Sequence, residues 1–441
     1  MKKVLIASTA LVAAGLLTTG TASASEKIKL ELGGFSKWWV VGQWQDKDFE
    51  SNLNTVAATA SSTPASGLSA TNVDVKGDNE IHFNGSTTLD NGIKVGVRVE
   101  LEAGGHTETN TGVANTMDVI DESYAYVETG FGKVMVGTYN NGTYLLHVSA
   151  PDAAGNWGEA AIMTGGLSVV KPGAVSGMLG GNTTAIATDG DAEKITYVAP
   201  SFYGLTLGAS YVPNAFSEDN RGVAAGANGP NAGAGALAST PLATDSSAYG
   251  VGALYANTFG GVGVKLSGGW VTYQVKSNNP IAGGSDMNNE YSAGAQLSYA
   301  GFTLGGSYRQ TNLNNATSGV GVLAAQAGQA NLAGGVTSTA ANGGIAASEG
   351  RAFDLGLQYA SGPYAVSFAY FNSSVNGIDG NGGRDTITFY QVSGKYTLGA
   401  GVDLLASAGY ADYKNEGTDV AGADANNNKG WAVMTGLSLA F

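Results

Sequence analysis

The chain of 441 residues has no cysteine, three histidines, nine prolines and only 13% charged residues. Without cysteine it can build neither a disulfide framework nor a thiol-based active site. No apolar run approaches the roughly 20 residues that a membrane-spanning helix needs. The low charge and the 43% hydrophobic content exclude a disordered chain. A formal net charge of -14 argues against a nucleic-acid partner.

The motifs of common enzyme and cofactor sites are missing as well. His82, His106 and His147 have no metal-ligand spacing, and there is no P-loop, dinucleotide fingerprint or G-x-S-x-G motif. The stretch from Asp424 to Asn428 begins like a calcium loop, but Thr435 stands where an acid is required. We interpret this stretch as a polar turn, and we predict no enzyme activity, catalytic residue, cofactor or resident metal.

The N-terminus has the organisation of a secretory signal peptide. Lys2 and Lys3 precede an apolar stretch, Val4 to Leu17, which is too short to span a bilayer. Ala22-Ser23-Ala24 forms an A-x-A cleavage site. We therefore predict that residues 1–24 are a signal peptide and that residues 25–441 form a single exported domain. An uncleaved N-terminal anchor is the alternative.

From Ser25 onward the pattern alternates between strand and turn up to the last residue. In the stretch from Trp431 to Phe441, large apolar residues occupy one face and small residues the other. The clearest hairpin turns through Asp90-Asn91-Gly92. Short connections alternate with long, polar, Gly/Asn-rich ones. The pattern predicts an all-β fold, a transmembrane antiparallel up-and-down β-barrel of about 16 strands with short periplasmic turns and long external loops. A soluble β-sandwich is the alternative, but it gives no reason for the sorted loop lengths.

Aromatic residues and glycines recur at regular places within the expected strands. Same-face aromatic pairs near opposite strand ends predict two girdles at the membrane surfaces. These pairs are Tyr291/Tyr299, Phe302/Tyr308, Phe353/Tyr359 and Tyr364/Tyr370. Glycines inside strands are expected where the barrel wall bends. They are Gly208, Gly294, Gly305, Gly356, Gly394 and Gly409.

Charged residues on faces that would point into a barrel are candidates for lining its channel. In a sandwich the same residues would be ordinary solvent-facing charges. Lys94, Arg98 and His82 gather on one hairpin, with Glu80, Glu100 and Glu102 beside them. The pore-lining candidates are His82, Lys94, Arg98, Glu100, Lys133, Asp152, Glu159, Arg309 and Asp354.

Residues 140–191 differ from the other long connections because they mix many apolar side chains with acids. Tyr144, Leu145 and Trp157 accompany Asp152 and Glu159. Exposed loop tips rarely hold so many apolar groups. We predict that this segment folds into the barrel as a constriction, with its acids facing a basic wall. Packing against a neighbouring subunit is the alternative.

With these features the mature chain resembles the Gram-negative general porins. The matching stretches are Gly33 to Trp38, the hairpin Ser123 to Gly137, Pro200 to Tyr211 and the terminal Phe441. The resemblance implies a sixteen-stranded barrel, a homotrimer, residues 140–191 as the constriction loop, and a C-terminal strand recognised by the barrel-assembly machinery. The chain departs from the family at Gly137-Thr138-Tyr139, which lacks an Arg-Gln often found there.

We therefore expect a porin of the Gram-negative outer membrane, surrounded by lipid and lipopolysaccharide. It would pass small hydrophilic solutes and ions by passive diffusion, with a mild cation preference suggested by the net charge. The alternatives are a substrate-selective porin for sugars, phosphate or peptides, and a structural or adhesive β-protein of the cell surface.

Overall fold

The computed structural model describes most of the chain after the predicted signal peptide. The described residues are 27–50, 72–104, 120–155, 169–172, 175, 184–187, 189–190, 192–213, 244–277, 287–312, 320–322, 346–376, 383–415 and 427–441. The signal peptide predicted at residues 1–24 and the pore-lining candidate Glu159 lie outside them.

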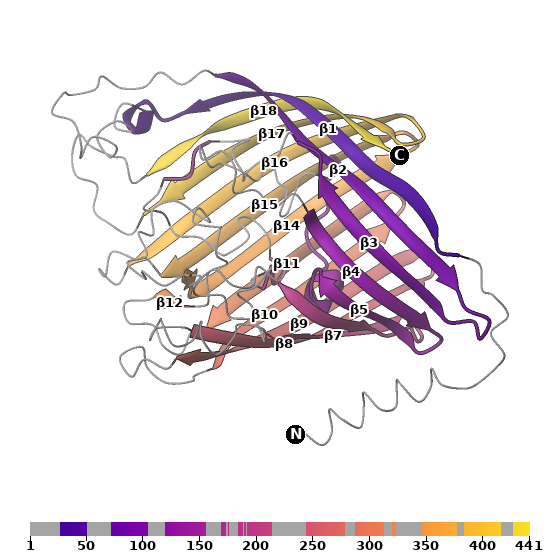
Figure 1. Ribbon diagram of the computed structural model, residues 1–441. Helices are drawn as coiled ribbons and strands as arrows, with labels where there is room; N and C mark the ends of the chain where they lie inside the picture. Colours follow the sequence, from indigo (N-terminus) through magenta and orange to yellow (C-terminus); the bar gives the residue numbers. More distant parts are fainter. Residues whose placement is uncertain are drawn as a thin grey trace.

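Sixteen strands of the described residues form one closed antiparallel barrel (Figure 1). They are β1 Lys29–Gln45, β2 Val73–Thr88, β3 Lys94–Glu102, β4 Ile120–Thr129, β5 Gly132–Thr138, β6 Glu193–Val198, β7 Leu205–Val212, β8 Thr244–Phe259, β9 Val262–Ser277, β10 Met287–Tyr299, β11 Phe302–Asn312, β14 Gly350–Ser361, β15 Tyr364–Asn376, β16 Arg384–Gly399, β17 Val402–Lys414 and β18 Asn428–Ala440. Each strand pairs with its neighbours along the chain, β11 with β14, and β1 with β18. The predicted all-β up-and-down barrel is confirmed.

One connection contains more structure than its composition suggested. The low composition complexity of the run from Asn312 to Glu349 predicts a loop. Within it, β12 (Val320–Val322) and β13 (Ala346–Ser348) pair as a separate two-stranded sheet. Strand pairing joins backbone groups, which every residue in this small-residue segment carries. Low complexity therefore did not exclude a short ladder.

Many large apolar side chains of the barrel wall point outward and are exposed. In β18, Trp431, Val433 and Leu437 are exposed, whereas Ala432 and Met434 are buried. The predicted two-faced closing strand is confirmed. No helix of the described residues is long and apolar enough to cross a membrane. The outward apolar band on the strands is the surface that faces lipid.

Two rows of outward aromatics border this apolar band. Along one row, Tyr370, Tyr390, Tyr410, Trp431 and Trp44 are successive cross-strand partners. The ring centroids of Tyr370 and Tyr390 are 5.0 Å apart, and those of Tyr410 and Trp431 are 4.9 Å apart. The opposite row, at the short turns, includes the ring pairs Phe302–Tyr359 and Tyr364–Tyr396. The two predicted girdles are therefore present.

The last residue closes the barrel seam. The backbone N–H of Phe441 donates to Gly34 O (3.1 Å), and the Gly34 N–H donates to Phe441 O (3.0 Å). Beyond that point β1 and β18 pair continuously from Phe35 with Ala440 to Gln45 with Gly430. The end of the chain thus supplies the final backbone pairing between the first and last strands.

Candidate functional site

The segment between β5 and β6 enters the barrel. We call its described residues, 139–155, 169–172, 175, 184–187, 189–190 and 192, the inner loop. It begins with the one-turn helix α3 (Gly142–Leu145), which lies within the ring of strands in Figure 1. Asn141 caps this helix, because its Oδ1 accepts hydrogen bonds from the N–H groups of Thr143 and Tyr144, both at 2.9 Å. The described part of residues 140–191 therefore lies against the inner wall, and its role as a constriction stays a prediction.

Glycines on the inner face of the wall let the inner loop approach the strands closely. A Cβ placed on Gly294 of β10 would lie 1.8 Å from Val148 O. At Gly208 and Gly252 a Cβ would lie 2.8 and 2.7 Å from Gly142 O. At Gly356 it would lie 3.0 Å from Ala150 Cβ. We call these close-approach positions the glycine seat, which consists of Gly208, Gly252, Gly294, Gly305 and Gly356. Close backbone approach, rather than wall bending alone, explains these strand glycines.

Inward hydroxyl and carboxylate groups satisfy the backbone donors of the inner loop. The N–H of Gly142 donates to Ser210 Oγ (2.7 Å), and the N–H of Val148 donates to Ser267 Oγ (3.0 Å). Further along, the N–H of Ala153 donates to Ser367 Oγ (2.8 Å). The hydrogen bonds therefore come from β7, β9 and β15, and they hold the loop against the wall along much of its path.

Three of the predicted pore-lining residues serve this attachment. Asp354 accepts from the N–H of Ala150 (3.2 Å), and Asp152 accepts from Ser367 Oγ (2.9 Å). Arg309 is 1% exposed, pairs with Glu290 (2.8 Å) and donates to the carbonyl of Ala185 (2.7 Å). All three face the barrel interior. Their described contacts join wall and loop, whereas the sequence suggested groups that face the open lumen.

His147 lies where the outgoing and returning parts of the inner loop meet. Its Nε2 is 2.9 Å from Thr184 Oγ1, which also contacts Ser307 on β11. Burial and, secondarily, the charge of Arg309 lower the pKa of His147 to about 4. The imidazole is therefore neutral at pH 7 while the loop is docked.

The loop also packs on a second, apolar part of the inner wall. Val169 and Val175 join a buried cluster with side chains from β1 and from β14 to β18, including Trp39, Phe371 and Phe389. The N–H of Val170 donates to the side chain of Gln45 (3.2 Å). The described loop contacts thus extend from β6 around the barrel to β1.

The charged residues of β2, β3 and β4 line another part of the inner wall, which has few contacts with the described residues of the inner loop. We call them the charged wall: Asp78, Glu80, His82, Arg98, Glu100, Glu102, Asp121 and Glu122. Among the described loop residues, those in contact with it are at the loop's start. Asn140 Nδ2 donates to Glu122 Oε1 (3.0 Å), and the rings of Tyr139 and Tyr124 are 4.4 Å apart. These contacts between the charged wall and the described loop residues are thus at the start of the loop.

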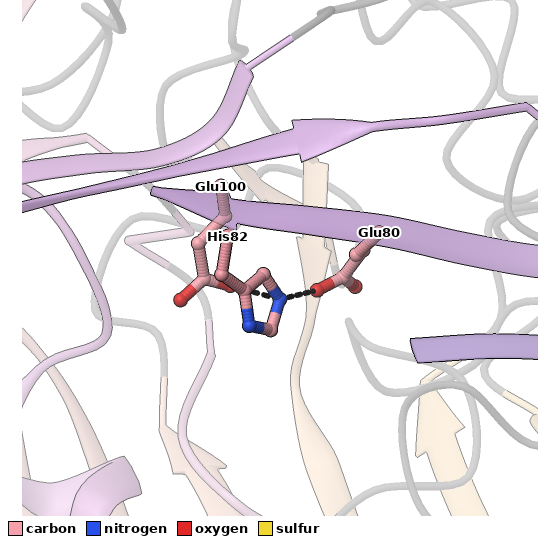
Figure 2. A group of neighbouring side chains, drawn as sticks. All are labelled: Glu80, His82 and Glu100. Atoms are coloured by element: carbon pink, nitrogen blue, oxygen red, sulfur yellow. Dashed lines mark hydrogen bonds and ion pairs between the residues drawn. The ribbon is translucent and has the colours of Figure 1, made fainter. Parts of the chain in front are cut away.

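His82 is the centre of an ionic network in this wall (Figure 2). Its Nε2 is 2.7 Å from Glu80 Oε2 and 3.6 Å from Glu100 Oε2. Arg98 pairs with Glu100, and its Nη2 is 3.2 Å from His82 Nδ1. Because arginine can only donate, Nδ1 accepts this bond, and Nε2 carries the proton that points to Glu80. The sequence grouped Lys94, Arg98 and His82 on one hairpin with Glu80, Glu100 and Glu102 beside them. The structure brings His82, Arg98, Glu80 and Glu100 together, whereas Lys94 lies opposite Glu128 and outside this network.

A β-bulge adds two acids that the sequence pattern did not reveal. The β3–β4 register passes from Val99 opposite Ser123 to Leu101 opposite Ile120, so that Asp121 and Glu122 together face Glu100. Carboxylate oxygens of these three residues lie within 4.8 Å of one another. Strict alternation would place Asp121 and Glu122 on opposite faces. The acid-rich composition of residues 120–122 was the available signal.

The charged wall is therefore acidic. Its carboxylates face Arg98 and the neighbouring Lys37, which is 3.1 Å from Asp78. The sequence led us to expect a basic wall opposite acids of the loop. In the charged wall, acidic side chains instead outnumber basic ones among the described residues. Lys94 and Lys133 lie nearer the short turns, where each is in register with Glu128. Lys133 Nζ is 4.3 Å from the centre of the Tyr126 ring.

Comparison with known proteins identifies the family. The model of the family "Gram-negative porin" matches residues 7–417. The chain belongs to the Gram-negative porins. It is therefore an outer-membrane channel for passive diffusion, in contact with lipid, and not a member of an enzyme family. No curated protein sequence matches this porin.

Solved porin structures share the barrel with little sequence identity. The outer membrane channel DcaP of Acinetobacter baumannii has a TM-score of 0.55 at 12% identity, with 96% of this chain and 100% of that chain covered. A porin refined at 1.8 Å gives 0.52 at 15% identity, and a loop-deleted OmpT of Vibrio cholerae gives 0.52 at 13%. Both comparisons cover 94% of this chain and 100% of the other. These likenesses concern the fold.

Adding one methyl group to the glycine seat should displace the inner loop. In Gly294→Ala the new Cβ meets Val148 O, so we expect a cost of about 1–3 kcal/mol in loop docking. Single-channel recordings should show a lower and noisier conductance. Gly268→Ala is the matched control, because a Cβ there has no neighbour within 4 Å among the described residues. Identical single-channel traces from both variants would show that close approach at the glycine seat does not position the inner loop.

Acidification should loosen the inner loop. The docked pKa of His147 is about 4 against an ordinary value of 6.5, so the undocked loop binds the proton more readily between these values. Docking is then fully favourable above pH 6.5 and weakens as the pH falls toward 4. Pepsin cleavage within the loop, divided at each pH by its cleavage of an unfolded reference peptide, should rise over this window. His147→Gln should lack that rise, and an unchanged profile in the variant would exclude His147 as the cause.

Proposed function

We propose that this porin is a general diffusion channel with a preference for cations and for small hydrophilic solutes of neutral or positive charge. The observation that supports the proposal is the acidic excess of the charged wall. It lies on the strands that have few described contacts with the inner loop. A permeating ion would pass this surface at short range, with low-dielectric protein around the path.

The mechanism requires no bond to form or break. The inner loop narrows the lumen and restricts the size of the solute, while the carboxylates raise the local concentration of cations. Arg98, Lys37 and His82 sit among the acids, so cations meet a mixed surface and are not held tightly. Mobile salt screens such fields over about 10 Å at 0.1 M, and the preference should therefore be strongest in dilute salt.

A substrate-selective porin is the second candidate. The acidic wall disfavours phosphate as its substrate, because a phosphate would meet like charge. Sugars and basic peptides remain compatible with a mixed wall of acids and donors. Block of the ionic current by one such solute at low concentration would favour this candidate over a general channel. The surface-adhesive alternative loses its basis with the porin family match.

Three further features are part of the proposal. We infer that residues 1–24 are a cleaved signal peptide, that the porin forms a homotrimer in contact with lipopolysaccharide, and that the barrel-assembly machinery recognises the strand ending at Phe441. The basic n-region and A-x-A site support the first inference. The exposed terminal ring, which is 68% accessible beside the β1–β18 seam, supports the third.

Neutralising the bulge acids should weaken the cation preference. For Asp121→Asn/Glu122→Gln we expect the permeability ratio of cation to anion to fall roughly twofold, because two charges leave the lumen surface. Reversal potentials in a planar bilayer under a dilute salt gradient measure it. Asp412→Asn is the control, since Asp412 pairs with Lys414 on the outer surface (3.0 Å). An anion-directed potential in the unmodified porin would refute the proposal.

Replacing the terminal aromatic should impair assembly more than stability. Phe441→Ala keeps the backbone bonds to Gly34 and the β1–β18 ladder, so detergent refolding should remain close to that of the parent. The amount of folded porin in the outer membrane should fall several-fold if machinery reads the ring. Leu439→Ala, which also truncates an outward apolar side chain of β18, is the comparison. Equal membrane levels for the parent and both variants would exclude Phe441 as an assembly signal.

A further inference from the structure

An open cavity lies on the outside of the barrel, near the long-connection ends of β11, β14 and β16. Its volume is about 280 Å³. The side chains that matter here are Tyr308, Gln310, Asn312, Glu349, Arg351 and Arg384. None of them belongs to the charged wall or to the inner loop. The cavity is therefore separate from the channel site.

The cavity faces the surroundings of the barrel and not its lumen. Arg351 shares its face of β14 with Phe353 and Leu355, which are outward and exposed. Tyr308, opposite Phe353 on β11, is exposed as well. Phe353 contacts Tyr370, which belongs to the aromatic row away from the short turns, at 5.7 Å between ring centroids. Arg351 is two residues beyond Phe353, so the cavity lies just outside that row, on the side of the long loops.

Strand register brings the two arginines to the same place. Ser374 of β15 is the partner of Arg351 on one side and of Thr386 on the other. Arg384, two residues from Thr386, donates from Nη1 to Ser374 O (3.3 Å). Among the described residues, neither guanidinium has a carboxylate within ion-pair distance. Glu349 also lines the cavity, which leaves an excess of one positive charge from these three residues.

Neutral polar groups complete the cavity wall. Tyr308 Oη donates to Gln310 Oε1 (2.9 Å), and Gln310 Nε2 donates to Asn312 Oδ1 (2.8 Å). This relay fixes the amides of Gln310 and Asn312, and the Asn312 amide nitrogen has no partner among the described residues. Two guanidinium forks beside ordered amide donors match an anion of phosphate geometry that carries further hydroxyl groups.

The location of the cavity decides the source of such an anion. A lipid-facing site just outside the aromatic girdle, at the long-loop end, lies at the headgroup level of the outer leaflet. We propose that this cavity binds a phosphate group of the outer-leaflet glycolipid, with Arg351 and Arg384 as the phosphate ligands. The inference rests on the outer-membrane location and not on the ion preference proposed for the channel.

Lipid binding to the full-length porin, folded in detergent, tests this site. Native mass spectrometry with added bisphosphorylated lipid A gives the Kd, and enzymatically dephosphorylated lipid A is the reference lipid. We expect Arg351→Gln/Arg384→Gln to raise the Kd for the phosphorylated lipid roughly tenfold or more, because each charge-assisted bond is lost. Lys429→Gln is the control, since Lys429 is exposed on β18 and does not line the cavity.

Separate results would overturn the inference. An unchanged Kd in the double variant, or equal binding of both lipids by the parent porin, would exclude a phosphate site. Displacement of the lipid by millimolar inorganic phosphate would identify a small-anion site instead. Arg351→Lys retains the charge but not the fork, so its Kd should fall between those of the parent and the glutamine variants. All variants should keep the parent's conductance, which shows that they are folded and separates this test from that of the channel.

Discussion

Lipid offers no hydrogen-bond partners, so every strand edge that meets it must be paired. This constraint governs the barrel, because sixteen strands leave no unpaired edge only when the first strand pairs with the last. The pairing of Phe441 with Gly34 completes that ring at the last residue. The same constraint explains why the outward face can be almost wholly apolar while the polar residues are directed into the lumen.

The inner loop meets a related requirement inside the barrel. A segment without long secondary structure must find partners for its backbone, and the inward serines and Asp354 provide them. The glycine seat then permits contact at backbone distance. Arg309 of β11, paired with Glu290 of β10, holds the returning part of the loop through the carbonyl of Ala185. These attachments hold the described part of the loop against the wall.

The sequence predicted the barrel and much of its polarity, because alternation of period two reports which face of a strand is apolar. It also placed His82 and Arg98 on one hairpin beside Glu80 and Glu100, but it added Lys94, which lies too far along β3 to join them. It could not assign Arg309 and Asp354 to loop attachment, because that depends on contacts between residues more than 100 positions apart. Nor could it place Asp121 and Glu122 together, because a bulge interrupts the alternation from which facing is deduced.

The glycine seat and the charged wall lie on different strands, and this division has an evolutionary consequence. Substitutions in β2 to β4 can change the charge that a solute meets without disturbing the seat in β7 to β14. Under the proposed function, a change of solute preference therefore needs no change in how the inner loop is attached, because the two properties depend on different strands.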